Sequence, residues 1–342
     1  MLPRAQGPRA VIFGCSGPKL SPAEKAFFRD CDPWAFILFA RNVETPEQIR
    51  RLTDDLRNAV GREALVFIDQ EGGRVQRLRP PHFRDCPPAQ RFGHIYASDP
   101  EKGKRAIWIN HRLIADELRS VGVTANCAPV LDLPVAKADP IISDRAFANN
   151  PASVIDMAHA AMAGLMSGGV APVIKHIPGH GRADVDSHKA LPVIKTWERV
   201  LSDTDYLPFM AFADAPMAMT AHVVVKHADP DLPVTLSATA MRELVRGKLG
   251  YDGLVMTDDL DMKALSGDLE DLTRRALKAG CDIGLHCNGK MRSMVKVAKG
   301  AGMLEGKALI RAITADYCAA TPDEFDAQAA LAELDELMAG TA

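Results

Sequence analysis

The sequence predicts an α/β fold of the TIM-barrel type, in which eight parallel strands alternate with helices within a single domain. Short apolar runs with the composition of buried strands recur eight times, and segments with helical apolar spacing lie between most of them. Such alternation is typical of a closed (β/α)₈ barrel. An open doubly wound sheet is the competing architecture, but the first turn, Gly14-Cys15-Ser16-Gly17, does not match its usual G-x-G-x-x-G pattern.

The elements follow one another without a linker, repeat or low-complexity tract. Predicted strands cover residues 10–13, 36–39, 64–68, 124–131, 172–174, 218–221, 254–257 and 282–285. Predicted helices cover residues 22–29, 46–59, 102–120, 152–166, 206–213, 238–249 and 269–278. Residues 324–338 mix alanine, leucine and acidic residues at helical spacing, so we expect a terminal helix packed on the barrel. Residues 1–342 are thus predicted to form one barrel domain with a C-terminal helix.

The composition excludes several classes of partner and location. The net charge of the 342 residues is -3, with no concentration of basic residues, so nucleic acid and anionic membranes are not expected partners. Seven cysteines, none in a Cys-x-x-Cys pair, fit a reduced compartment better than a disulfide framework. The apolar run at residues 10–13 is too short for a signal peptide or a membrane span. We expect a cytoplasmic monomer.

The densest group of reactive side chains lies in residues 175–188, after the fifth predicted strand. Three histidines, two aspartates, a lysine and an arginine surround Pro178, Gly179 and Gly181, which exclude a regular helix. We expect Lys175 and His176 to emerge at the carboxyl end of the strand. A long polar loop after a buried strand indicates an active site.

Polar residues also follow the other predicted strands, as a barrel active site requires, because such sites lie at the carboxyl ends of the strands. We therefore expect a polar pocket at this rim. The residues are Arg41 and Asn42, residues 69–74, Asp132, Lys175 and His176, His222, Asp258 and Asp259, and Asn288.

Three segments carry a family resemblance: residues 67–78 (FIDQEGGRVQRL), 175–188 (KHIPGHGRADVDSH) and 255–262 (VMTDDLDM). In this order they resemble the family 3 glycoside hydrolases, and within them the single-domain bacterial β-N-acetylhexosaminidases of peptidoglycan recycling. The KH-x-PGHG-x-x-x-x-DSH pattern is the most specific part. Two details differ: Ile177 replaces an aromatic residue, and residues 143–148 (SDRAFA) are a looser version of an Arg-Ser-Phe-Gly segment.

The resemblance implies an exo-acting, retaining β-N-acetylglucosaminidase that needs no metal or cofactor. It would remove terminal N-acetylglucosamine from muropeptides such as GlcNAc-anhydroMurNAc. Asp258 matches the family's nucleophile, and His188 with Asp186 matches an Asp-x-His pair that acts as acid/base. The pair is chemically reasonable, because residues two apart on an extended stretch can face the same way and an imidazole titrates near neutrality.

The resemblance also implies a set of sugar-binding residues. Carboxylates accept hydroxyl hydrogen bonds, and Arg and Lys donate them. His180, Arg182 and His222 receive no assigned role. The matching residues are Asp69, Arg77, Arg145, Lys175 and His176.

Other interpretations stay open at this point. Asp259 can be a helix cap, His188 an exposed loop residue, and Lys175 and Arg145 surface charges. A metal-dependent hydrolase is a rival, because His176, His180, His188, Asp184 and Asp186 could bind zinc, although Pro178 and Gly179 deny His176 and His180 a common helix face. A phosphorylase and a non-catalytic sugar-binding protein are further alternatives.

Overall fold

The strands form one closed parallel barrel. The computed structural model describes residues 7–136 and 138–339. Nine strands pair in parallel in the order β7-β6-β3-β2-β1-β13-β12-β10-β8. β7 and β8 stand at the two ends of this order and are separated in the chain only by Val173, so the sheet closes on itself. β7 and β8 together occupy the place of the fifth predicted strand, so the nine segments make eight barrel strands and the predicted (β/α)₈ barrel is confirmed. The strands are β1 (Arg9–Gly14), β2 (Pro33–Leu38), β3 (Leu65–Ile68), β6 (Ala125–Asn126), β7 (Ala171–Pro172), β8 (Ile174–Ile177), β10 (Met217–Thr220), β12 (Leu254–Asp259) and β13 (Ile283–His286).

Some strand boundaries differ from the prediction. Lys175 and His176 belong to β8 rather than to the loop after it, and Asp258 and Asp259 are the last residues of β12. The fourth strand, predicted over residues 124–131, keeps a regular ladder only at β6, and Pro129 in its second half has no N–H to donate. Two ribbons lie outside the barrel: β4 (Gln70–Gly72) with β5 (Val75–Gln76), and β9 (Val193–Ile194) with β11 (Val224–Val225).

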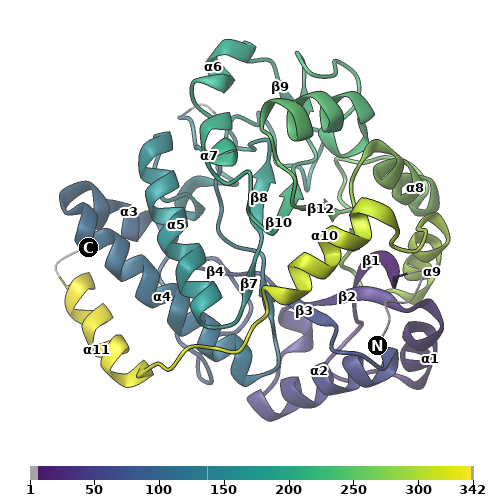
Figure 1. Ribbon diagram of the computed structural model, residues 1–342, viewed down its shortest axis with the longest axis horizontal. Coiled ribbons are helices and arrows are strands. Elements are labelled where there is room, and N and C mark those ends of the chain that lie inside the picture. The colour runs from purple at the N-terminus through teal and green to yellow at the C-terminus, as the bar shows by residue number, and fades with distance from the viewer. Residues whose placement is uncertain (1–6, 137, 340–342) are drawn as a thin grey trace.

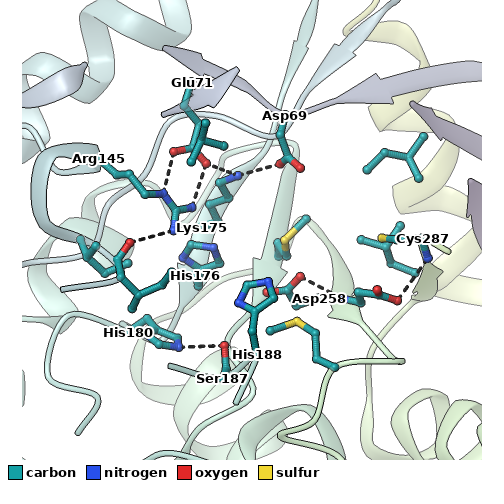
Figure 2. A pocket seen from close by; sticks show the side chains of 18 of the residues that line it. Asp69, Glu71, Arg145, Lys175, His176, His180, Ser187, His188, Asp258 and Cys287 are labelled. Carbon is teal, nitrogen blue, oxygen red and sulfur yellow. Dashed lines mark hydrogen bonds and ion pairs between the residues drawn. The ribbon is translucent and has the colours of Figure 1, made fainter. Parts of the chain in front are cut away.

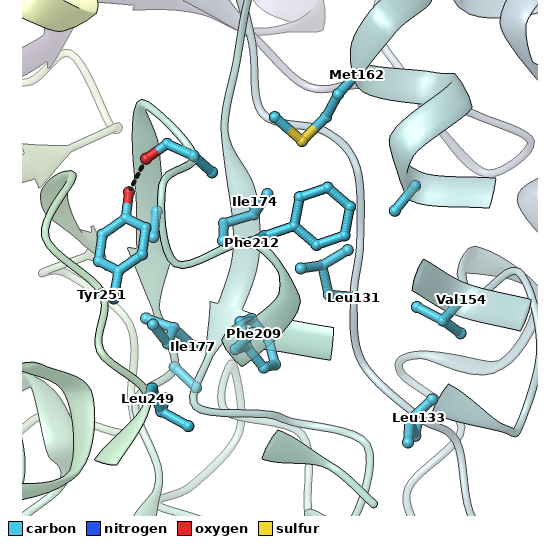
Figure 3. Packing of buried hydrophobic residues seen from close by; sticks show 14 of the residues in the cluster. Leu131, Leu133, Val154, Met162, Ile174, Ile177, Phe209, Phe212, Leu249 and Tyr251 are labelled. Atoms are coloured by element: carbon cyan, nitrogen blue, oxygen red, sulfur yellow. Dashed lines mark hydrogen bonds between the residues drawn. The ribbon is translucent and has the colours of Figure 1, made fainter. Parts of the chain in front are cut away.

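Alternate strand residues face opposite sides of the sheet, as the two-residue period requires. Ile12 and Phe67 belong to the cluster inside the barrel, whereas Val11 and Val66 pack outside it. Another outer cluster includes Ile177 of β8 together with Phe209 and Phe212 (Figure 3). All of these side chains are buried, so packing on both faces fixes the register of the strands that carry the polar rim.

Helices surround the barrel (Figure 1). A typical one, α2, begins after Thr45, whose side chain accepts the Gln48 N–H, and ends at Gly61 in the left-handed conformation. The seven predicted helices correspond to α1 (Pro22–Cys31), α2 (Pro46–Val60), α4 (Pro100–Ser120), α5 (Pro151–Ser167), α7 (Tyr206–Ala211), the π-helix Ala240–Lys248 and α8 (Leu269–Ala279). The terminal helix is α11 (Ala327–Met338), which starts at its Asp326 cap rather than at residue 324.

Several helices were not predicted. They are α3 (Ala89–Ser98), α6 (Glu198–Ser202), α9 (Met291–Gly300), α10 (Gly306–Tyr317) and the short 3-10 helices Ala40–Asn42, Ser143–Arg145 and Val234–Leu236. Ala312 and Ala315 of α10 pack into the interior cluster, and Leu304 just before α10 bonds the backbone of Pro8. α10 therefore covers the amino end of the barrel. No helix in the described part of the chain is long and apolar enough to cross a membrane.

Candidate active site

A pocket of about 200 Å³ opens at the carboxyl ends of the strands (Figure 2). Of the eight residues that were assigned a role, only Asp186 is absent from its lining; it contacts the pocket residue His188 instead. Segments from all around the barrel therefore converge on one pocket, as the rim pattern predicted. Outside residues 69–74, five further residues expected at the rim do not line the pocket: Arg41, Asn42, Asp132, His222 and Asn288. The predicted residues that line it are Asp69, Arg77, Arg145, Lys175, His176, His188 and Asp258.

One wall of the pocket is a network of paired charges. Lys175 Nζ lies 3.0 Å from Asp69 Oδ1 and 2.6 Å from Glu71 Oε1. Arg145 donates two parallel hydrogen bonds of 2.8 Å to the Glu71 carboxylate, and Arg77 donates to Asp69 Oδ2 at 2.9 Å. Three cations thus surround two carboxylates, so neither carboxylate is buried without a partner. Lys175 and Arg145 are not surface charges.

The pairing keeps this wall ionised. Burial alone would raise the pKa of Asp69 and of Glu71, but the neighbouring lysine and arginines hold both pKa values well below their ordinary range. Burial would lower the pKa of Lys175, yet the two carboxylates raise it above its usual value. The wall therefore offers charged acceptors and donors side by side, as sugar hydroxyls require.

Local backbone geometry produces this wall. Asp69 follows β3, and Asp69 and Glu71 stand two residues apart on an extended segment, so they face the same side. Gln70 points the other way, and its Oε1 accepts the N–H groups of Arg77 and Leu78, which fixes the turn that carries Arg77. Glu71 was expected at the rim among residues 69–74 but received no role, although its spacing from Asp69 was a usable signal.

A bulge at the end of β12 brings two neighbouring carboxyls to the pocket. Met256 pairs with Ile283, but Asp259 pairs with Leu285, so β12 has one more residue than β13 over this stretch. Both Asp258 and Asp259 consequently line the pocket. Adjacent residues of a regular strand would face opposite sides.

The two carboxyls have different electrostatic surroundings. Burial would raise the pKa of Asp258, but His222, His176 and the Asp259 N–H bring it below its ordinary value. Burial raises the pKa of Asp259 to about 6. Asp259 is not a helix cap, since its Oδ1 accepts the N–H groups of Asp261 and Cys287, and α8 is capped by Asp268. Asp258 is thus the carboxyl that stays ionised.

His188 and Asp186 form a hydrogen-bonded pair. His188 Nδ1 lies 2.9 Å from Asp186 Oδ1, which also accepts the His188 backbone N–H at 2.9 Å. The carboxylate makes Nδ1 the donor and leaves Nε2 available for chemistry. Burial would raise the pKa of Asp186, but its bonds to His188 lower it. In Figure 2 the His188 ring extends into the pocket from below.

Buried partners hold the other histidines. His176 Nδ1 lies 2.6 Å from Asp132 Oδ2, so Asp132, which had no assigned role, orients a ring on the pocket wall. His180 donates its backbone N–H to Asp132 Oδ1 at 2.6 Å, and its Nε2 lies 3.2 Å from Ser187 Oγ. His222 is fully buried behind the pocket, and its Nε2 donates to the Asp259 carbonyl at 3.1 Å. Arg182 pairs with Asp205 and fixes the loop rather than the pocket.

Three of the five candidate zinc ligands, His176, His180 and His188, line the same pocket, but each candidate is engaged by a different partner. His176 contacts Asp132, His180 contacts Ser187, His188 pairs with Asp186, and Asp184 accepts the Val193 N–H. Over residues 7–136 and 138–339, no three His, Cys, Asp or Glu side chains form a group suited to a metal ion. This distribution of donors disfavours the metal-dependent alternative.

Known proteins resemble the chain in sequence and fold. Residues 21–312 match the Glycosyl hydrolase family 3 N terminal domain. Beta-hexosaminidases of Alkalilimnicola ehrlichii and Thioalkalivibrio sulfidiphilus are 39% and 40% identical, each over 81% of this chain and 80% of the relative. NagZ from Neisseria gonorrhoeae in complex with N-trifluoroacetyl-D-glucosamine is 28% identical, with a TM-score of 0.88 over 98% of this chain and 100% of that chain. The chain therefore belongs to glycosyl hydrolase family 3, and it is a glycoside hydrolase.

Proposed function

We propose that the protein is an exo-acting, retaining β-N-acetylglucosaminidase. The observation that carries the proposal is that an ionised Asp258 and His188, whose ring is bonded to Asp186, share one pocket with the charged wall around Lys175. A double displacement needs a carboxylate nucleophile and an acid/base group at one sugar. The relatives named beta-hexosaminidase, and the glucosamine derivative bound to NagZ, support an N-acetylhexosamine as that sugar.

In the first step, Asp258 attacks the anomeric carbon while the glycosidic bond breaks, and His188 Nε2 donates a proton to the leaving oxygen. In the second step, neutral His188 accepts a proton from water, and the water oxygen displaces Asp258. Asp186 accepts the hydrogen bond from Nδ1 and so keeps a proton there, which leaves Nε2 to give its proton to the leaving oxygen and to take one from water. Since Asp258 is buried and its pKa is lowered, it is ionised at neutral pH, as a nucleophile must be.

The charged wall binds the hydroxyls of the terminal sugar. Asp69 and Glu71 accept from hydroxyls, and Arg77, Arg145 and Lys175 donate to them, with His176 Nε2 as a further contact. The pocket, at about 200 Å³, is smaller than the roughly 300 to 1,000 Å³ of common ligand sites. That size suits one terminal sugar and supports exo cleavage.

We further propose that the substrates are peptidoglycan-derived muropeptides, GlcNAc-anhydroMurNAc among them, and that the protein works in the cytoplasm. All seven cysteines are free, and five of them are buried, which agrees with a reduced compartment. Aryl β-glycosides that differ only at the 2-position test the sugar preference. Assays with and without phosphate separate hydrolysis from phosphorolysis.

Two variants test the mechanism. Asp258→Ala should abolish turnover of every substrate, since no leaving group replaces the missing nucleophile. His188→Ala should lower kcat/KM for a disaccharide by roughly 10²- to 10⁴-fold, the usual contribution of general acid catalysis. A nitrophenolate leaves without a proton, so His188→Ala should retain a burst with that substrate, followed by slow turnover.

Asp184→Ala is the matched control, since Asp184 is an exposed carboxylate on the same loop and does not line the pocket. It should leave both substrates nearly unaffected. The product of the wild-type enzyme should appear first as the β-anomer. An inverted product, or equal losses in His188→Ala with the two leaving groups, would contradict the mechanism.

A further inference from the structure

The orientation of the His188 ring depends on the two residues just before it, Asp186 and Ser187. The His188 side chain is 64% exposed, so packing does little to hold it. Asp186 and Ser187, by contrast, are buried, with 8% and 4% of their surface exposed. The backbone that carries His188 is therefore anchored at these two residues. Asp186 already has a role as the partner of the ring, but Ser187 has none.

Ser187 bonds to segments on both sides of the catalytic rim. Its Oγ lies 3.2 Å from Nε2 of His180, near the start of the same loop. Its carbonyl oxygen accepts the N–H of Ala264 at 3.0 Å. Ala264 belongs to the segment that follows β12, the strand that ends with Asp258 and Asp259. Ser187 thus connects the loop of the acid/base pair to the segment after the nucleophile.

His180 is a rigid partner for this contact. Its backbone N–H bonds Asp132 Oδ1 at 2.6 Å, and only 4% of the residue is exposed. The next residue, Gly181, packs so closely that an added Cβ would lie 1.9 Å from the Leu133 carbonyl oxygen. Burial and the nearby His176 lower the pKa of His180 to about 4, so its ring is neutral at working pH.

The proton arrangement on His180 follows from its surroundings. In the described part of the chain, its buried Nδ1 has no hydrogen-bond partner, so the contact with Ser187 is the ring's one hydrogen bond there. With the proton on Nε2, the only unsatisfied group is the acceptor lone pair of Nδ1. With the proton on Nδ1, a buried N–H donor would lack an acceptor, which costs more free energy. His180 Nε2 therefore donates to Ser187 Oγ.

We propose that Ser187 is a positioning residue for the acid/base step: bonded to His180 and to Ala264, it holds the backbone of His188 at the distance from Asp258 that proton donation needs. The inference rests on the proposed function, in which His188 is the proton donor. It adds a residue that lines the pocket and has its printed side-chain bond to His180, and whose loss should be felt only where a proton must be delivered.

Ser187→Ala tests this role, because it deletes the bond to His180 and keeps the backbone bond to Ala264. We expect kcat/KM for a disaccharide substrate to fall roughly tenfold, as a loosened acid would produce. For a nitrophenyl glycoside, the rate of the burst should change less than about twofold, since that step needs no proton. Steady-state turnover of the same glycoside should slow, because water attack again uses His188.

Ser187→Thr and His180→Gln are the conservative controls, because each keeps a group able to make the bond. Both should stay close to the wild type, and thermal unfolding of all variants shows whether each is folded. His180→Leu should reproduce the leaving-group dependence of Ser187→Ala, and the double variant should be no worse than either single one, because both delete one contact.

Equal losses with the two leaving groups would mean that Ser187 binds the sugar or supports the fold, and would overturn the inference. So would wild-type activity in a folded Ser187→Ala. His188→Ala, measured alongside, separates this failure from that of the proposed function. If His188→Ala itself shows no dependence on the leaving group, the assignment of His188 as the acid is wrong. If only Ser187→Ala shows no such dependence, the positioning role of Ser187 is wrong.

Discussion

Charge compensation at single residues decides what the pocket wall can do. Lys175 has 2% of its side chain exposed, and an isolated ammonium at that depth would lose its proton. Asp69 and Glu71 keep it charged, and Lys175 and the arginines keep the carboxylates charged in return. In the proposed function, the wall therefore presents charged partners that are already in place for the hydroxyls of a sugar.

Asp69→Ala should weaken binding of the sugar and of the transition state while the nucleophile and acid remain. Lys175 keeps Glu71 as a partner, so the loss is mainly that of a charged acceptor for hydroxyls. We expect a cost of about 1.5 to 3 kcal/mol, or roughly ten- to 150-fold in kcat/KM. Steady-state kinetics on a nitrophenyl glycoside measure it.

Asp144→Ala is the control for this prediction, because Asp144 is also paired with an arginine, Arg74, but lies outside the pocket lining. It should change kcat/KM by less than about twofold, as exposed ion pairs contribute little. Unchanged kcat/KM in Asp69→Ala would remove Asp69 from the sugar-binding wall.

For single residues, the sequence predicts which residues belong to the site better than it predicts which side chains they will bond to. Asp258, His188 and Lys175 could be proposed because motifs and strand ends mark them. Glu71 and Asp132 act through partners that come from other strands, and nothing in the local sequence shows which side chain will be opposite. The bulge that turns Asp258 and its neighbour to one pocket is likewise a property of strand pairing.

At the scale of elements, α3 supports the segment that carries Arg145. Gly93 of α3 packs so tightly that a Cβ there would lie 1.8 Å from the carbonyl oxygen of Phe147, two residues after Arg145. Gly93→Ala must therefore push α3 away from this segment. Since Arg145 holds Glu71 through two bonds, we expect KM for the sugar substrate to rise severalfold, with a loss of stability of about 1 to 3 kcal/mol from overpacking.

Gly302→Ala provides the comparison, because an added Cβ at Gly302 meets nothing within 4 Å. That variant should match the wild type in KM and in its urea midpoint. If Gly93→Ala lowers stability but leaves KM unchanged, α3 supports the fold and not the position of Arg145.

Elements are predictable to the extent that they carry strong local signals. Most residues of the barrel strands are buried and apolar, so all of these strands were found, with errors at the ends where Lys175 or Asp258 continues a strand despite its charge. α9 and α10 were missed because neither begins with a capping side chain, and each buries only two residues, Met294 and Val297 in α9 and Ala312 and Ala315 in α10. Their helical state depends on packing against the barrel.

For the whole molecule, two sets of buried groups act in opposite directions as the pH falls. Burial raises the pKa of Asp259 and of Asp316 to about 6, so both bind a proton in the folded chain before the unfolded one and offset part of the effect of the buried histidines. Burial lowers the pKa of four histidines, to about 4 for His111 and His180, and below the ordinary value for His222 and His286. An unfolded histidine titrates near pH 6.5. Between that pH and the lowered folded values, these histidines bind protons in the unfolded chain that they do not bind in the folded chain, so the four histidines reduce stability on acidification.

The ion-paired carboxylates Asp69 and Glu71 act in a lower pH window. The folded pKa values of Asp69 and Glu71 lie below their unfolded values near 4, so their stabilisation is complete above about pH 4 and is lost only below it. A decline in stability that starts well above pH 5 would therefore come from the histidines. The two windows can be separated by experiment.

We predict that the free energy of unfolding falls as the pH is lowered from about 7 to about 5, with a limiting slope near 1.4 kcal/mol per pH unit for each buried neutral histidine. Urea denaturation across this range measures it. His111→Asn is the diagnostic variant: an amide can still donate to the Ile107 carbonyl, as His111 Nδ1 does at 3.0 Å, but cannot bind a proton. The free energy of unfolding of this variant should depend less steeply on pH than that of the wild type, by about the contribution of one buried histidine. A free energy of unfolding that stays constant over this range, or an unchanged slope in His111→Asn, would show that these histidines do not stay neutral in the folded protein.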